Sequence, residues 1–196
     1  MLLLDDKQKV EELKKISQKL KRRQRVICSD ECNLTSPNQM GNESNTYKKS
    51  SKPNGVWFGH GNSWLRYLLI EMELERKSAW AWGRKRLLGI RGIFELKLNL
   101  PKILRIRNTK EFEAFEDRFA NKHKEWINWE KVEKYWDGIE IRYLARKAKW
   151  SNSDTPSFWY DGWDVSGGAI WNNQSIKKIE LLACCEPHWE LNIKLA

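Results

Sequence analysis

Two carboxylates in the segment 135–171 are set among aromatic residues and could do chemistry. Asp164 follows a tryptophan, and Glu140 separates two isoleucines. Carboxylates in such surroundings are common at catalytic sites, because burial and neighbouring groups tune their ionisation. The sequence therefore predicts Asp164 and Glu140 as candidate catalytic residues. The alternatives are a turn-capping aspartate at 164 and a solvated strand face at 140.

The other acids of this segment are predicted to form turns. Asp137 and Asp161 are each followed by glycine, and Asp-Gly favours tight turns because glycine accepts positive φ while aspartate bonds nearby backbone. His60 lies between two glycines and is a better candidate for contact with a ligand than His123, which lies between two lysines. A loop histidine without a role is the alternative.

The periodicity of the chain predicts the elements that must position these residues. Apolar residues at three- and four-residue spacing predict an N-terminal helix over 6–24. Strict alternation over 92–100 predicts a strand with one wet face. Further helices are expected at 64–74, at 109–119 with Asn108 or Thr109 as the cap, and at 127–135 with Asn128 as the cap. Further strands are expected at 25–28, 56–58, 101–107, 139–143, 163–171, 176–182 and 188–193, and a long polar loop over 28–55.

The net charge of +10 favours an anionic partner such as nucleic acid, an anionic membrane surface or an anionic substrate. Residues 76–92 interleave tryptophans with cations, which is typical of a grip on single-stranded nucleic acid; a charged, exposed hairpin or loop is the alternative. The residues expected to contact nucleic acid or another anion are Arg22, Arg23, Arg84 and Arg86.

The cysteines and the apolar runs bear on the compartment. No run of 18 apolar residues exists and no signal peptide is evident, so the sequence predicts a cytoplasmic protein without a transmembrane segment. The four cysteines, Cys28, Cys32, Cys184 and Cys185, are then expected to be free thiols. Their spacing with His188 does not match the tighter ligand pairs of zinc sites, so no metal is expected.

The stretch from Gly55 to Leu182 resembles the ADP-ribosyltransferase fold. The resemblance is carried by Tyr-Trp-Asp-Gly-Ile-Glu-Ile at 135–141 and by Gly-Trp-Asp-Val-Ser-Gly-Gly-Ala-Ile-Trp at 162–171, which look like the version in small phage-type proteins. It implies an α+β fold with a pair of short central sheets and flanking helices. The expected organisation is a basic amphipathic helix (1–26), a polar flexible loop (27–54) and an α+β core domain (55–196).

The resemblance also implies NAD as cofactor, bound in a cleft between two sheets. By position, Arg25 would hold the cofactor from the first strand, His60 and Ser63 would contact it, and Trp57 would lie against its nicotinamide end. A carboxylate would stabilise the positive charge that develops as nicotinamide leaves. Gly167 stands where the family has its catalytic glutamate, which leaves Asp164 and Glu140 as substitutes.

The sequence thus leads to three hypotheses. The first is an NAD-dependent ADP-ribosyltransferase, or a diverged nucleotide-binding relative, acting on a protein or nucleic-acid acceptor. The second is a non-catalytic basic module that binds nucleic acid. The third is a protein-interaction module that uses exposed tryptophans among its twelve as anchors. The acceptor and the oligomeric state are not determined by the sequence.

Overall fold

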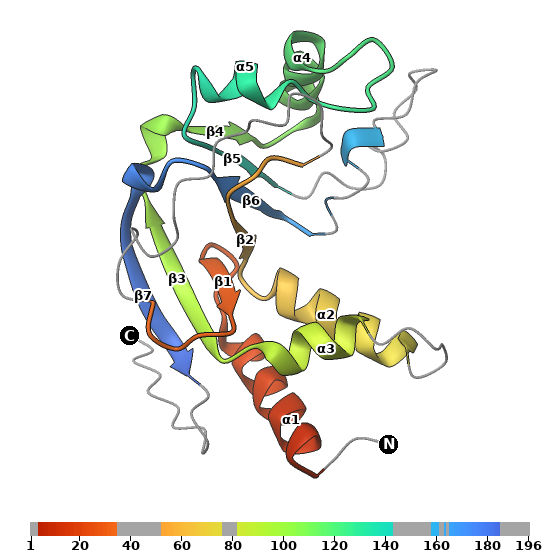
Figure 1. Cartoon of the computed structure of the whole chain (residues 1–196), viewed down its shortest axis with the longest axis vertical. Helices are drawn as coiled ribbons and strands as arrows, with labels where there is room; N and C mark the ends of the chain where they lie inside the picture. Colours follow the sequence, from red (N-terminus) through yellow and green to blue (C-terminus); the bar gives the residue numbers. More distant parts are fainter. Residues whose placement is uncertain are drawn as a thin grey trace. The chain divides into compact units, whose positions relative to one another are not determined.

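The structure is a computed structural model of the chain that describes residues 4–34, 52–75, 82–142, 158–160, 163 and 165–184. These residues form a mixed α+β fold with five helices and seven strands (Figure 1). The chain divides into two compact units. Unit 1 consists of Met1–Ser36, Phe58–Lys97 and Lys178–Ala196, and unit 2 of Pro37–Trp57 and Leu98–Lys177.

Unit 1 contains three helices and most of four strands. Its helices are α1 (Leu4–Lys19), α2 (Ser63–Glu75) and α3 (Trp82–Gly89). Its strands are β1 (Arg25–Ser29), β2 (Val56–His60), β3 (Gly92–Leu98) and β7 (Ile176–Cys184), in the order β2-β1-β3-β7. Strand β1 runs antiparallel to both β2 and β3. The boundary with unit 2 passes through β2, after Trp57.

The core of unit 1 is mainly aliphatic. The apolar stripe predicted for the N-terminal helix is confirmed, because Val10, Leu13 and Ile16 are all buried. They pack with side chains of α2, α3 and the strands, namely Val26, Leu65, Leu68, Met72, Leu87, Ile90, Ile93 and Ala183. Helix α1 ends at Lys19, earlier than predicted, and a turn then leads into β1. The alternative of a hairpin or loop at 76–92 is wrong over 82–89, which is helix α3.

Unit 2 contains three strands and two α-helices. Strands β4 (Ile103–Ile106) and β5 (Gly138–Ile141) are parallel, and β6 (Gly167–Ile170) runs antiparallel to β5. Its helices are α4 (Thr109–Phe119) and α5 (Trp129–Glu133), with short 3-10 turns at Leu100–Lys102, Phe158–Tyr160 and Asn173–Ser175. Asn108 and Asn128 cap α4 and α5 through side-chain bonds to backbone N–H groups, as expected.

The core of unit 2 is aromatic. Phe112, Phe115 and Phe119 lie on one face of α4, as their spacing predicts, and all three are buried. Phe112 and Phe115 contact the ring of Trp159, which stacks on Phe112 at a centroid distance of 5.4 Å. The remaining buried members of this core are Ile106, Ile127, Trp129, Val132, Ile139, Ile141, Tyr160, Trp163 and Trp171.

Asp137, which directly precedes β5, is hydrogen-bonded to the segment after β6, in keeping with a structural role. Its carboxylate accepts hydrogen bonds from Ser175 Oγ at 2.6 Å and from Asn172 Nδ2 at 3.2 Å. Glycine follows it because a β-carbon at Gly138 would lie 2.8 Å from the carbonyl oxygen of Ala169. Position 138 therefore requires glycine because the backbone packs closely against β6 there. The second Asp-Gly pair, Asp161-Gly162, lies outside the described residues.

Candidate functional site

Three of the residues predicted to hold a cofactor gather at one end of two paired strands in unit 1. Arg25 is the first residue of β1 and His60 the last residue of β2, and they are direct partners across the antiparallel pair. Side chains of such partners leave the same face of a sheet with β-carbons about 5 Å apart. Ser63 begins α2 three residues further on. The fold thus pairs Arg25 with His60, which the sequence left on separate segments, whereas Ser63 Oγ lies beside Gly59 and therefore on the opposite face of β2.

Close packing of α2 against β2 holds this group together. A β-carbon at Gly59 would lie 2.9 Å from Ser63 Oγ and 3.1 Å from the β-carbon of Trp64, so the start of the helix requires glycine there. The His60 ring meets Phe58 edge to face, with centroids 5.8 Å apart. His60 and Arg25 are both partly exposed. Arg25 and His60 thus present a guanidinium and an imidazole on one face of the paired strands, and these two groups suit an anionic ligand.

The candidate carboxylate Glu140 lies in unit 2 and is buried, with 3% of its surface exposed. Its neighbour on β4 is Arg105 and its neighbour on β6 is Gly168, which form one row across the three strands. Arg105 Nε lies 3.8 Å from the carboxylate and makes no hydrogen bond within the described part of the chain. Glu140 is therefore part of a buried ion pair beside a glycine.

Gly167 and Glu140 do not occupy equivalent positions. Gly167 is the partner of Ile141, while Glu140 is the partner of Gly168. Consecutive strand residues point to opposite faces of a sheet, so a side chain at 167 would leave the face opposite to that of Glu140. A glutamate at position 167 and Glu140 would therefore lie on opposite faces of the sheet. Asp164, the second candidate, lies outside the described residues.

Trp57 belongs to unit 2 and is half-buried against Trp163. Their rings meet edge to face with centroids 4.8 Å apart, and the ammonium group of Lys52 lies 5.5 Å from the Trp57 ring centroid. The indole N–H of Trp163 is buried and has no hydrogen-bond acceptor among the described residues. A buried donor usually finds a partner, so this part of the aromatic core has an unused polar group.

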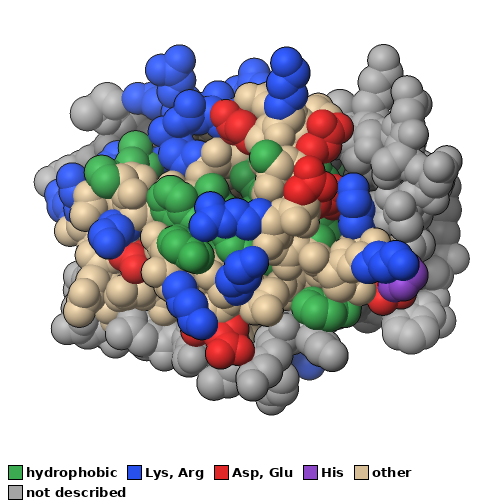
Figure 2. All heavy atoms as spheres, turned by 90° about the horizontal axis from the view of Figure 1, so that it is seen from above, with side chains coloured by type: hydrophobic (Ala, Val, Ile, Leu, Met, Phe, Trp, Pro, Cys, Tyr) green, Lys and Arg blue, Asp and Glu red, His purple; other side chains and the backbone are tan. Residues whose placement is uncertain are grey.

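The predicted anion-contacting arginines have different surroundings. Arg22 and Arg23 are both exposed in the turn between α1 and β1. Arg86 is exposed on α3, and Arg84 lies in the same helix, with its side chain outside the description. The face that carries α4 and α5 shows hydrophobic side chains among lysines and arginines (Figure 2). Tyr135, two residues after α5, is an exposed aromatic, and the guanidinium of Arg118 from α4 lies 4.6 Å from its ring centroid.

None of the tryptophans whose side chains the structure describes is an exposed anchor of the kind that the interaction hypothesis requires. Where their side chains are described, they are buried or half-buried. The half-buried ones are Trp57, Trp64, Trp126 and Trp136. Among the described residues, the large hydrophobic side chains that are exposed are Ile70, Leu100, Tyr135 and Leu181, which are scattered along the chain.

A buried carboxylate that sequence analysis missed is Glu116 of α4, which is 3% exposed. It accepts a hydrogen bond of 2.7 Å from Trp159 Nε1 and forms a 3.0 Å ion pair with Lys124. The helical spacing contained the signal, because residue 116 lies four positions after Phe112 and therefore on the same apolar face. Every polar contact given for Glu116 is internal to unit 2, which is typical of a structural role.

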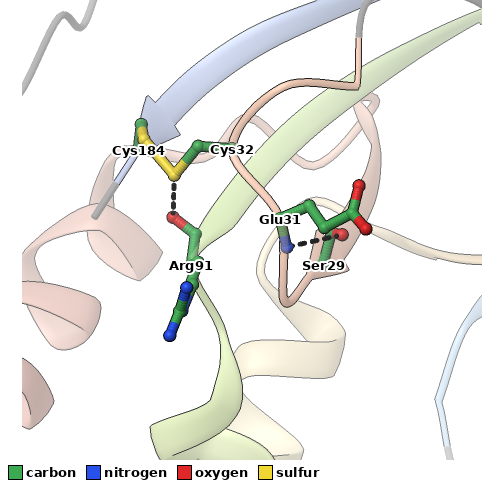
Figure 3. The surroundings of a disulfide bond; sticks show 5 residues. All are labelled: Ser29, Glu31, Cys32, Arg91 and Cys184. Atoms are coloured by element: carbon green, nitrogen blue, oxygen red, sulfur yellow. Dashed lines mark hydrogen bonds between the residues drawn. A yellow bond between two sulfur atoms is a disulfide. The ribbon is translucent and has the colours of Figure 1, made fainter. Parts of the chain in front are cut away.

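The prediction of free thiols is wrong for two cysteines. Cys32 and Cys184 form a disulfide with a Cα–Cα distance of 5.4 Å (Figure 3). The sequence could not reveal it, because 152 positions separate the pair and only the fold brings β7 beside the segment after β1. Cys32 Sγ lies 3.0 Å from the carbonyl oxygen of Arg91; only the reduced thiol has a hydrogen to donate to that oxygen. Cys28 is free, and burial raises the pKa of its thiol to about 12.

Comparison with protein families, with curated proteins and with solved structures found no match to this chain. The function of this chain is therefore inferred from its own residues. Within the described residues, no helix is both long and apolar enough to cross a membrane. In the same residues, no three side chains of the metal-binding types are grouped for an ion.

Proposed function

We propose that this chain is an NAD-dependent ADP-ribosyltransferase, or a diverged nucleotide-binding relative, that acts on a protein or nucleic-acid acceptor. The observation that supports this most is the pairing of Arg25 with His60. In the family that the sequence resembles, a first-strand arginine or histidine holds the cofactor, and here both residue types meet at the end of the first strand. A guanidinium suits the pyrophosphate of NAD, because its planar fork matches two phosphate oxygens.

The reaction would break the bond between nicotinamide and the ribose of NAD and form one between that ribose carbon and an acceptor atom. The acceptor loses its proton to solvent or to a nearby base. Positive charge develops on the ribose as nicotinamide leaves, and a fixed carboxylate stabilises it. Glu140 and Asp164 remain the two candidates for that carboxylate.

Nicotinamide release from NAD and the thermal shift produced by NAD test the proposal on the full chain. Arg25→Gln and His60→Ala should each abolish the NAD-dependent shift, because each removes one member of the pair. Arg91→Gln is the matched control, since Arg91 is an exposed arginine of the same unit and should bind NAD normally. Absence of transfer, of nicotinamide release and of any nucleotide-dependent shift in the unaltered chain would together rule the proposal out.

Two further variants identify the carboxylate. Asp164→Asn and Glu140→Gln both keep the side-chain shape and remove the charge. The residue that stabilises the ribose should, when changed, lose nicotinamide release while the NAD-dependent thermal shift persists, because binding precedes charge development. Equal rates in both variants and in the unaltered chain would show that neither carboxylate acts in this way.

A second candidate is a non-catalytic binder, which the burial of Glu140 favours. Its carboxylate is already paired with Arg105 and 3% exposed, whereas a catalytic carboxylate must reach the substrate. An NAD-dependent thermal shift without nicotinamide release would identify a nucleotide-binding relative. Binding of nucleic acid without any NAD-dependent shift would identify the basic binding module.

A further inference from the structure

The turn between α1 and β1 concentrates positive charge beside the Arg25–His60 pair. Its residues are Lys21, Arg22, Arg23 and Gln24, and the first three are exposed. Lys19, the last residue of α1, is also exposed, and Arg25 follows the turn directly. Consecutive exposed cations on one short turn form a surface to which an extended polyanion could bind along several of its charges.

The backbone of this turn is held in place by the connection between β2 and α2 and by β3. Gly61 donates its N–H to the Gln24 carbonyl oxygen at 2.8 Å. It has φ of +55°, and a β-carbon there would lie 3.0 Å from Arg22 Cα. The Gln24 side chain accepts from Lys21 N at 2.6 Å and donates to Glu95 at 3.1 Å. Because the backbone is fixed before a ligand arrives, less ordering entropy is lost on binding.

Two elements near the turn add little negative charge beside Arg22 and Arg23. Glu95 of β3 accepts from Gln24 and also forms a 2.6 Å ion pair with Lys97. Helix α2 has no acidic residue in its first turn, and the exposed Arg66 is located there instead. Arg22 and Arg23 are both exposed, so their charge is directed to solvent.

We infer that the Lys21–Gln24 turn binds the phosphodiester backbone of a single-stranded nucleic acid; as a statement about the acceptor, this rests on the proposed transferase function. Arg22 and Arg23 would contact successive phosphates through their guanidinium groups, which match phosphate oxygens better than an ammonium does. The strand would then pass beside Arg25 and His60. Nucleic acid fits better than an acidic protein, because adjacent arginines meet a regularly repeated phosphate.

The test measures fluorescence anisotropy of a fluorescein-labelled 20-nucleotide oligouridine with the full chain over a range of KCl concentrations. Each phosphate contact in a single strand contributes about 0.7 to the slope of log K against log salt. The Arg22→Gln/Arg23→Gln variant should therefore bind roughly tenfold or more weakly at low salt and show a slope smaller by about 1.4. Both residues are exposed, so the fold should be retained.

The control variant Lys102→Gln/Lys110→Gln removes the same charge from exposed positions of unit 2 and should leave the slope unchanged. A second variant, Gly61→Ala, keeps both arginines but disturbs the turn, and should weaken binding while circular dichroism stays the same. The inference is overturned if the arginine variant keeps the affinity and slope of the unaltered chain, or if the lysine control falls as far. It is equally overturned if polyglutamate of matched charge competes as well as unlabelled oligouridine.

Two measurements separate this inference from the proposed function. Binding of oligouridine without NAD depends on the turn alone, and nicotinamide release without nucleic acid depends on the Arg25–His60 pair and the carboxylate. Loss of oligouridine binding in the Arg22→Gln/Arg23→Gln variant with normal nicotinamide release supports the inference. Nicotinamide release without oligouridine binding in the unaltered chain overturns the inference and leaves the proposed function standing.

Discussion

The two units of this chain stabilise their folds in different ways. Unit 1 packs helices on strands through aliphatic side chains, and a disulfide joins its two most distant segments. Unit 2 packs aromatic rings around a buried carboxylate, Glu116, which Trp159 and Lys124 satisfy. The two units also differ in where their charged side chains lie. Unit 1 exposes the cations of the Lys21–Gln24 turn, whereas unit 2 buries two carboxylates and pairs each with a cation.

This contrast shows where substitutions should affect stability and where they should affect binding. A buried charge that loses its partner keeps the cost of its desolvation, so removal of Lys124 from Glu116 or of Arg105 from Glu140 should destabilise unit 2. An exposed cation on a fixed turn has little such cost. Changes at Arg22 or Arg23 should therefore alter ligand binding without altering the fold. Stability measurements made separately on the two units test this division.

The largest expected effect is loss of the disulfide. Cross-linking positions 152 residues apart restricts the unfolded chain strongly, and the chain-entropy model gives a contribution of about 5 kcal/mol. Cys32→Ser/Cys184→Ser, or reduction by dithiothreitol, should lower the free energy of unfolding by up to that amount. Hydrogen exchange read by mass spectrometry should show the loss in peptides of β1, β3 and β7.

Loss of the disulfide should lower hydrogen-exchange protection less in unit 2 than in unit 1. Peptides from α4 and β5 should keep their protection after reduction, because the cysteine pair lies in unit 1 alone. Equal loss of protection in both units would show that they unfold as one cooperative body. In a reducing cytoplasm the pair would be held as thiols, and the reduced thiol of Cys32 would then be able to donate to the Arg91 carbonyl oxygen, now 3.0 Å away.

The next effect concerns the aromatic core of unit 2. Trp159 is fully buried and donates to Glu116, so Trp159→Ala leaves both a large cavity and a carboxylate oxygen without its partner. We expect a loss of about 3–5 kcal/mol. Chemical denaturation followed by far-ultraviolet circular dichroism measures it.

Trp126→Ala is the matched control for that measurement. Trp126 is half-buried and outside the aromatic core, so its removal should cost about 1 kcal/mol. Similar losses for both tryptophans would mean that the core derives no special stability from the contact between Trp159 and Glu116.

Local patterns in the sequence predicted the elements whose signals are local. The stripe of α1, the phenylalanine face of α4 and the asparagine caps follow from the helical repeat and from side-chain bonds to nearby N–H groups. The alternation of β3 likewise predicted its strand. These features depend on residues within a few positions of each other, so one sequence suffices to find them.

The long-range features were not predictable in the same way. Strand pairing brings His60 beside Arg25, and the course of β7 brings Cys184 to Cys32; neither follows from local periodicity. The helix at 82–89 was missed because its interleaved cations and tryptophans resemble an exposed loop, while the burial of Leu87 depends on packing against other elements. Candidate residues could be named from the sequence, but the groups that they form required the fold.

The smallest expected effect is a pH dependence carried by Cys28 of β1. Burial raises the pKa of its thiol to about 12 from its ordinary value of 9.0. In the folded state the thiol stays protonated up to that pH, while in the unfolded chain it ionises from about pH 9. The stabilisation is complete below pH 9 and is lost as the pH rises towards 12, because the unfolded state alone releases its proton.

The loss due to Cys28 should be about 1 kcal/mol between pH 9 and pH 10. Lysines and tyrosines also titrate at high pH, so the measured quantity is the difference in slope between the unaltered chain and Cys28→Ala, each followed by urea unfolding. Below pH 9 the variant should be less stable than the unaltered chain, and it should lack this part of the slope. Parallel slopes would mean that burial does not raise the pKa of the Cys28 thiol in the folded state.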